Sequence, residues 1–233
     1  MKRIFVIICV LISILSFSQD KVELLNKGNE YFQEEDFEKA EEYYKKSLEL
    51  DNQYYKANLN TGHSLFRQAF SLIQEQDTTG LKECLESSEL FYRSSLEVTT
   101  NKNEKSESLY NLGNAQLLSQ NLEESIESYK KSLRLFPENM NAKNNLALAQ
   151  YLLNKKQENQ EDSKKEQENK EEEEKNNQSQ ENKQKDQAEE KVEELSKEEI
   201  EQILKALERE EEEVQEDLQK KKIIGGNKLL KDW

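Results

Sequence analysis

The chain has 233 residues, of which 36% are charged and 33% hydrophobic, and its formal net charge is −15. This length allows one good-sized domain with extensions, and the negative charge disfavours nucleic acid and anionic lipid as partners. All nine tyrosines lie within residues 19–153, and Trp233 is the only aromatic residue after residue 153, so the folded part is expected to end near residue 153.

Residues 1–18 have the pattern of a secretory signal peptide. Lys2 and Arg3 precede an apolar run that ends in Ser16-Phe17-Ser18,. The run has about 14 residues, whereas a membrane-spanning helix needs about 20. Cleavage after Ser18 is therefore predicted, with an uncleaved anchor at residues 4–17 as the alternative. The protein is expected to be exported, and to be periplasmic or envelope-associated after cleavage.

Two segments, 21–54 and 106–139, repeat the same helix–turn–helix pattern. Gly28 of LLNKGNEYF corresponds to Gly113 of LYNLGNAQL, and Ala40 corresponds to Ser125. Glycine costs a helix interior about 1 kcal/mol relative to alanine, so a packing reason is expected for it. We predict that each glycine faces the small residue of the second helix, Ala40 or Ser125.

The unit between them, 55–105, is longer. Gly62 matches the repeat glycine, but about 14 residues are inserted before Ser88,. Apolar residues at helical spacing continue the first helix to Ile73, and Asp77-Thr-Thr-Gly80 predicts a turn,. This unit is expected to form a hairpin about two turns taller than its neighbours.

Three further segments follow the repeats. Residues 140–153 predict a closing helix with Ala147 in the glycine's place,. Residues 154–195, almost only Lys, Glu, Gln, Asn, Asp and Ser, predict an acidic, disordered linker; calcium binding is a weak alternative because no calcium-loop motif is present,.

An amphipathic helix is expected at 196–222, before a tail at 223–233. A stripe of fewer than three heptads is a poor coiled-coil signal, so this helix is expected to dock on a partner or to fold back on the repeats. Its apolar stripe comprises Ile200, Ile203, Leu204, Leu207, Val214 and Leu218.

Over residues 21–153 the pattern resembles the tetratricopeptide repeat (TPR) family. The resemblance implies an all-α fold, a short solenoid of helical hairpins with a closing helix. More broadly, the layout resembles the exported TPR proteins of bacterial aerotolerance operons (BatC-like). The features shared with that group are the export signal, the short array, the Glu/Lys/Gln tract and the terminal Lys231-Asp232-Trp233. This second resemblance implies a place in the cell envelope and cooperation with membrane proteins that carry von Willebrand-type A domains.

The residues needed for catalysis do not gather in the sequence. Outside residues 1–18 there is one histidine, His63, and one cysteine, Cys84, and they are predicted on different helices. No His or Cys cluster has the spacing of a metal site, and no glycine loop suits a phosphate. The chain is therefore predicted to be no enzyme and to use no cofactor, no metal and no small-molecule substrate. Cys84 is expected to be a buried structural residue.

The candidate site is the inner surface that first helices line in TPR arrays. An asparagine lies two residues before the glycine, or before Ala147, in all four units. An amide offers a donor and an acceptor, which suits a peptide backbone; the alternative is that these amides bridge adjacent repeats. The predicted groove residues are Asn26, Asn29, Phe32, Asn60, His63, Phe66, Tyr110, Asn111, Asn114, Leu117, Asn145 and Tyr151.

These features predict a non-enzymatic scaffold or adaptor of the bacterial cell envelope. It would bind an extended segment of another envelope protein in the TPR groove. The alternative function is an exported assembly chaperone that holds envelope proteins transiently. Stable capture of one partner would distinguish the first from weak binding of many.

Overall fold

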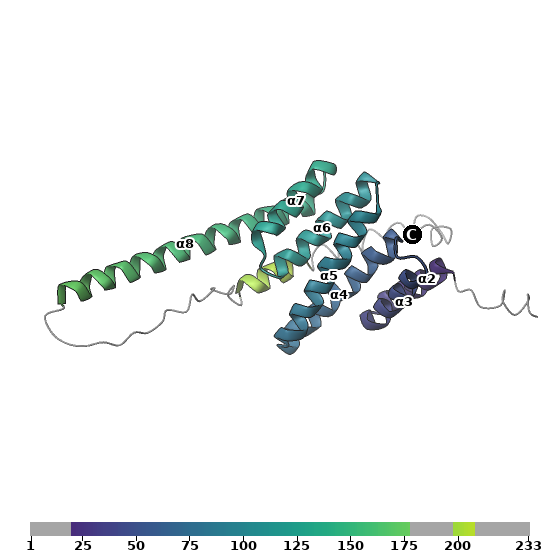
Figure 1. Cartoon of the computed structure of the whole chain (residues 1–233), viewed down its shortest axis with the longest axis horizontal. Coiled ribbons are helices and arrows are strands. Elements are labelled where there is room, and N and C mark those ends of the chain that lie inside the picture. The colour runs from purple at the N-terminus through teal and green to yellow at the C-terminus, as the bar shows by residue number, and fades with distance from the viewer. Residues whose placement is uncertain (1–19, 178–197, 208–233) are drawn as a thin grey trace, which may run out of the picture. The chain divides into compact units, whose positions relative to one another are not determined.

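The computed structural model describes residues 20–177 and 198–207. The predicted signal peptide, the tract 178–195 and the tail 223–233 lie outside these residues. The described residues contain helices and no strand (Figure 1). An unlabelled helix at 198–207 follows seven labelled ones, which are α2 (Lys21–Gln33), α3 (Phe37–Leu50), α4 (Tyr55–Glu75), α5 (Thr78–Val98), α6 (Lys102–Leu118), α7 (Leu122–Leu135) and α8 (Met140–Asn177). The predicted all-α fold of helical hairpins is confirmed.

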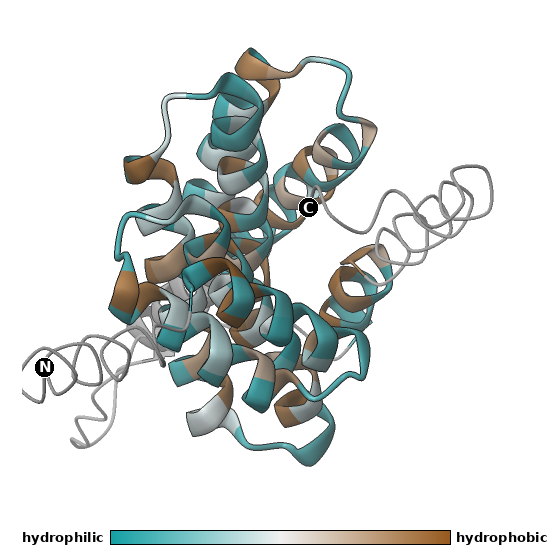
Figure 2. Cartoon of the chain, turned by 90° about the vertical axis from the view of Figure 1, so that its right-hand side faces the viewer, coloured by the Kyte–Doolittle hydropathy of each residue, from teal (hydrophilic) through white to brown (hydrophobic). Residues whose placement is uncertain are grey.

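The chain divides into two compact units, which are described separately. The first runs to Ala115, and the second begins at Gln116 near the end of α6. Individual helices carry both apolar and polar residues, as amphipathic helices do (Figure 2),. In the first unit, α2 packs on α3, α3 on α4, and α4 on α5. In the second unit, α7 packs on α8.

The same turn joins the two helices of each hairpin. Glu35, Gln76 and Gln120 each have φ near 60°, in the left-handed region. The backbone N–H of the residue after each of them donates to the carbonyl five residues earlier, for example from Asp77 to Leu72 at 3.0 Å. This is the Schellman bond that closes a helix end. The Asp77 side chain then accepts from the Gly80 amide at 3.0 Å and begins α5. The turn predicted at 77–80 is therefore shorter, because Thr78–Gly80 are already helical.

Gly28 and Gly62 face tyrosine rings, and the nearest side chain to Gly28 is Tyr44 instead of the predicted Ala40. A Cβ atom on Gly28 would lie 2.5 Å from Cδ1 and Cε1 of Tyr44. A Cβ atom on Gly62 would lie 2.7 Å from Cε1 of Tyr92. Both tyrosines are almost fully buried. The missing side chain therefore makes room for an aromatic ring of the second helix.

The second hairpin has the predicted extra height. Its helices α4 and α5 have 21 residues each, whereas α2 has 13 and α3 has 14. At 3.6 residues per turn this adds about two turns to each helix.

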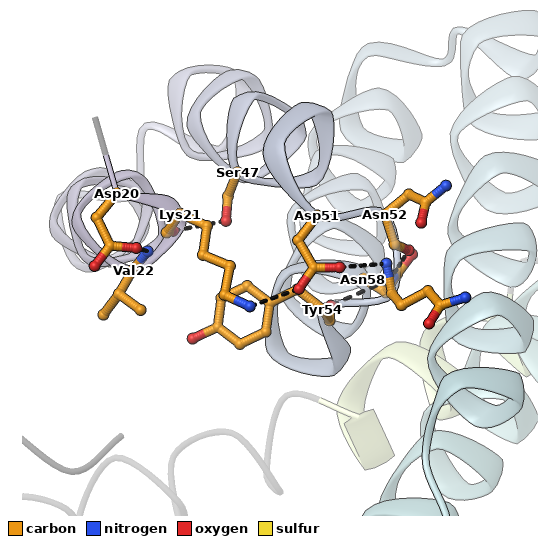
Figure 3. A network of polar contacts seen from close by, with 9 residues as sticks. Asp20, Lys21, Val22, Ser47, Asp51, Asn52, Tyr54 and Asn58 are labelled. Carbon is orange, nitrogen blue, oxygen red and sulfur yellow. Dashed lines mark hydrogen bonds and ion pairs between the residues drawn. The ribbon is translucent and has the colours of Figure 1, made fainter. Parts of the chain in front are cut away.

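Polar contacts tie the base of the first repeat together (Figure 3). At the start of α2, Lys21 Nζ lies 2.5 Å from Asp51 Oδ2, which follows α3, and 4.9 Å from the ring centre of Tyr54. Ser47 Oγ of α3 donates to the Lys21 carbonyl at 2.7 Å. Asn58 of α4 donates to the carbonyl of Tyr54 at 3.2 Å. These contacts fix the first turn of α2 against the link between α3 and α4.

The closing helix is longer than predicted, because α8 continues past residue 153 to Asn177. Residues 154–177 are therefore helical, where their composition predicted a solvated linker. Glu, Lys and Gln favour helix, and no proline or glycine lies between Pro137 and Gly225 to stop it,. A shortage of apolar residues disfavours a hydrophobic core in this segment, but it does not prevent the segment from forming a helix. Within the described ranges no helix is long and apolar enough to cross a bilayer.

Candidate partner-binding surface

A pair of hydrogen-bonded amides joins the first helices of the first two repeats. Asn60 Nδ2 of α4 donates to Asn29 Oδ1 of α2 at 3.0 Å. The Tyr44 hydroxyl of α3 donates to the same oxygen at 2.8 Å. Asn29 and Asn60 are both half-buried. The structure thus shows the bridging role that the sequence left open as an alternative for these two residues.

These bonds hold the Asn29 amide. Its Oδ1 accepts from Asn60 Nδ2 and from the Tyr44 hydroxyl, which is the assignment that satisfies both donors,. Its Nδ2 group makes no hydrogen bond to any other described residue. Asn29 therefore presents N–H donors on the side away from Tyr44 and Asn60.

A second polar link joins α4 to α6. His63 lies beside the side chain of Asn111, and its ring lies edge-on to Tyr92 with centroids 5.6 Å apart. Burial lowers the pKa of His63 to about 4, against a small opposing effect of the Asn111 bond. His63 is therefore neutral at pH 7.

A carboxylate lies beside this link. The Tyr55 hydroxyl of α4 lies 3.0 Å from Glu107 Oε2 of α6 and 3.0 Å from the Glu104 carbonyl. Asn111 Nδ2 donates to the Glu107 carbonyl at 3.0 Å. Burial raises the pKa of the Glu107 carboxyl, and the Tyr55 bond opposes that rise.

Aromatic side chains continue the surface toward the tall hairpin. The rings of Phe66 and Phe70 pack edge to face with their centroids 5.3 Å apart. The rings of Phe32 and Phe37 pack in the same way with their centroids 5.1 Å apart. The Arg67 guanidinium lies 4.8 Å from the Phe37 ring centre. The sequence analysis identified Phe32 and Phe66 but missed the other three. Phe70 lies four residues after Phe66 and three after Arg67, so helical spacing could have found both,.

The other predicted groove residues differ in exposure. In the first unit, Asn26 is exposed, Tyr110 is half-buried and Asn114 is buried. In the second unit, Leu117 and Asn145 are buried, whereas Tyr151 is 56% exposed. A partner could reach the buried ones only after they are uncovered, so contact through them stays a prediction.

His63 and Cys84 lie on different helices, α4 and α5, as predicted. Cys84 is a free, half-exposed cysteine, so it is less buried than expected. Burial raises the pKa of its thiol, and the Glu41 carboxylate adds to the rise. Across residues 20–177 and 198–207, no three His, Cys, Asp or Glu side chains form a group that could hold a metal ion.

The helix at 198–207 carries part of the predicted second binding surface. Ile203 and Leu207 are buried, and Ile200 and Leu204 are half-buried. Val214 and Leu218 lie outside the described residues. Lys155 Nζ of α8 lies 2.8 Å from Glu199 Oε1 of this helix, so the segment folds back on the chain. Folding back was one of the two outcomes that the sequence left open.

Comparisons with known proteins identify the repeats. Residues 22–54 and 106–139 match the tetratricopeptide repeat, at the two places predicted from the spacing. The chain therefore contains TPR units. No curated protein matches the sequence.

Three solved structures have similar folds. The first TPR of Spaghetti (RPAP3) bound to HSP90 peptide SRMEEVD is 23% identical, with a TM-score of 0.49 over 59% of this chain and 95% of that one. The first TPR domain of human RPAP3 is 21% identical, with a TM-score of 0.49 over 58% and 93%. The Arabidopsis OM64 TPR domain is 16% identical, with a TM-score of 0.47 over 55% and 93%.

Proposed function

We propose that this protein is a non-enzymatic scaffold that binds an extended segment of a partner protein along α2, α4 and α6. Arrays of helical repeats present extended binding surfaces of this kind. The observation that carries the proposal is the half-buried Asn29 amide, whose Oδ1 accepts from Tyr44 and Asn60 while its Nδ2 group bonds to none of the described residues. Such donors suit the backbone carbonyls of a peptide that is read without regard to its side chains.

The neighbouring aromatic rings give the proposed partner a second kind of contact. Phe32 and Phe66 are half-buried, so each keeps part of its surface accessible. The partner segment would place apolar side chains against these rings while its backbone accepts from Asn29. Neutral His63 offers no cation to pair with an acidic side chain of the partner.

The first experiment identifies the partner. A photo-crosslinking amino acid replaces Phe66 in the full chain, and a control places it at exposed Glu97 on α5. Irradiation in the native cells should join one protein stoichiometrically at position 66 and not at 97. Equal products at both positions would contradict the proposed surface. A broad mixture of weakly joined proteins would favour the chaperone instead.

The second experiment tests the Asn29 donors directly. Asn29→Asp keeps an acceptor for Tyr44 and Asn60 but removes the Nδ2 donors. It should weaken binding of the identified partner at least tenfold, measured by calorimetry, without lowering the thermal stability. Gln33→Glu is the matched control, because it makes the same chemical change at an exposed position of α2. Unchanged affinity in Asn29→Asp would remove this surface from consideration.

The proposal also places the protein in the bacterial cell envelope. The export pattern of residues 1–18 supports this location, and the resemblance to the BatC-like group supports a membrane protein with a von Willebrand-type A domain as partner. N-terminal sequencing of the processed protein should begin at Gln19. An intact Met1 in the membrane fraction would instead mean that residues 4–17 anchor the chain.

A further inference from the structure

We infer that α8 around Lys155 is a helix-docking surface, and that residues 198–207 are its built-in occupant, which a partner helix of the same pattern displaces. The pattern is an acidic residue followed by aliphatic residues four and eight positions later. This surface is separate from the one proposed on α2, α4 and α6.

The contact between the two segments is specific. Lys155 Nζ lies 2.8 Å from Glu199 Oε1, and the Glu199 side chain is only 10% exposed. The hydrogen bond and the charge of Glu199 raise the pKa of Lys155. Because residues 155 and 199 are far apart in sequence, this ion pair is a tertiary contact between the 198–207 helix and α8.

One face of the 198–207 helix is turned inward. Glu199, Ile203 and Leu207 lie four residues apart, so they share a face. They are 7%, 1% and 5% exposed. The opposite face, with Glu201, Gln202 and Lys205, is exposed. The segment is thus an amphipathic helix seated by its apolar face, with an ion pair that sets its position.

This docking is poised to be reversible. A helix of about ten residues is marginal by itself, so its order depends on packing. Two aliphatic side chains and one ion pair are a small gain against the entropy of ordering the segment.

The covalent connection also makes the helix a competitor. Its docking is intramolecular, which gives it a high effective concentration at Lys155. A partner helix binds only the undocked fraction, so its apparent affinity falls in proportion. Releasing the built-in helix should therefore strengthen the binding of an added one.

Zero-length crosslinking tests the occupancy. A carbodiimide joins a lysine amine to a neighbouring carboxylate as an amide. In an equal mixture of ¹⁴N- and ¹⁵N-labelled full chain, the Lys155–Glu199 product should contain one isotope only. Products that combine the isotopes would show exchange between copies and overturn the intramolecular docking. Absence of the product would overturn the contact itself.

Competition tests the docking surface. A fluorescent peptide with the sequence of residues 196–208 is added to full-length variants, and binding is followed by anisotropy. Ile203→Asp should release the built-in helix and tighten peptide binding at least tenfold, and Leu207→Asp should do the same independently. Gln202→Asp, at the exposed neighbouring position, should bind the peptide as weakly as the wild type does. Equal binding by all four chains, or no binding to the two released variants, would overturn the inference.

Discussion

The ring of Tyr92 lies so close to Gly62 that a Cβ atom on the glycine would be 2.7 Å from Cε1. In an open helix, Gly→Ala stabilises by about 1 kcal/mol. Here we expect Gly62→Ala to destabilise the protein by about 1–3 kcal/mol, because the buried ring cannot move away without disturbing its packing. Urea denaturation followed by circular dichroism measures the change.

A double mutant separates this clash from other effects of the substitution. With Tyr92→Leu in the background, the added methyl group meets a smaller side chain, so Gly62→Ala should cost less than in the wild type. Equal costs in both backgrounds would show that Tyr92 is not the residue that requires the glycine.

The left-handed turn residues should be sites of stabilisation. Gln76 has φ near 60°, which costs a residue with a side chain about 1 kcal/mol or more,. Gln76→Gly is therefore expected to raise the free energy of unfolding by about 1 kcal/mol. Gln74→Gly, within the last turn of α4, is the control and should lower it by a similar amount. A loss of stability in both variants would contradict the role assigned to the turn.

His63 should make stability depend on pH. Its pKa is lowered to about 4 in the folded protein, against about 6.5 in an unfolded chain,. The unfolded state therefore binds more protons between these values, and stability should fall as the pH drops from 6.5 to 4, by roughly 2–3 kcal/mol. His63→Gln should flatten the curve in this window.

The pKa itself can be measured without assignment, because His63 is the only histidine in the chain. Its ring protons in an NMR titration should show a midpoint near pH 4. A midpoint near 6.5 would mean that the ring is solvated and that the link to Asn111 is not closed in solution.

Cys84 should react slowly with alkylating reagents. Burial and the carboxylates around it, Glu41 first among them, raise its pKa, so little thiolate is present at pH 8,. Iodoacetamide should modify it several-fold more slowly than a free thiol, and Glu41→Gln should accelerate the reaction. Glu86→Gln, an exposed change on the same helix, should leave the rate unchanged. A rate equal to that of a free thiol would contradict this environment.

The fold could be predicted well because the repeat shows in the sequence as a regular spacing of small and apolar residues. The distances from Gly28 to Ala40 and from Gly113 to Ser125 located two hairpins, and the inserted residues before Ser88 predicted the third. Spacing gives equivalent positions but not contacts between side chains. The glycine was therefore assigned to Ala40 when its neighbour is the larger Tyr44, one turn later on the same helix.

The candidate site was predictable only in part, for a similar reason. The row of asparagines is visible in the sequence, but a single chain does not show that Asn60 bonds to Asn29. Such pairs join residues that lie about 30 positions apart, and two amides can bond to each other, to a partner or to water equally well. Likewise, the low hydrophobicity of residues 154–177 could not show that they continue α8.

The extra height of the second hairpin restricts how its length can vary. Its second helix, α5, exceeds α3 by seven residues, 21 against 14. Seven residues advance an α-helix by two turns with a drift of only about 20°, so the side chains beyond the insertion stay in phase with those before it. Adding one or two residues to α4 would rotate the side chains beyond them by about 100° or 200° relative to α5. This hairpin should therefore lengthen or shorten in whole turns, and in both helices at once.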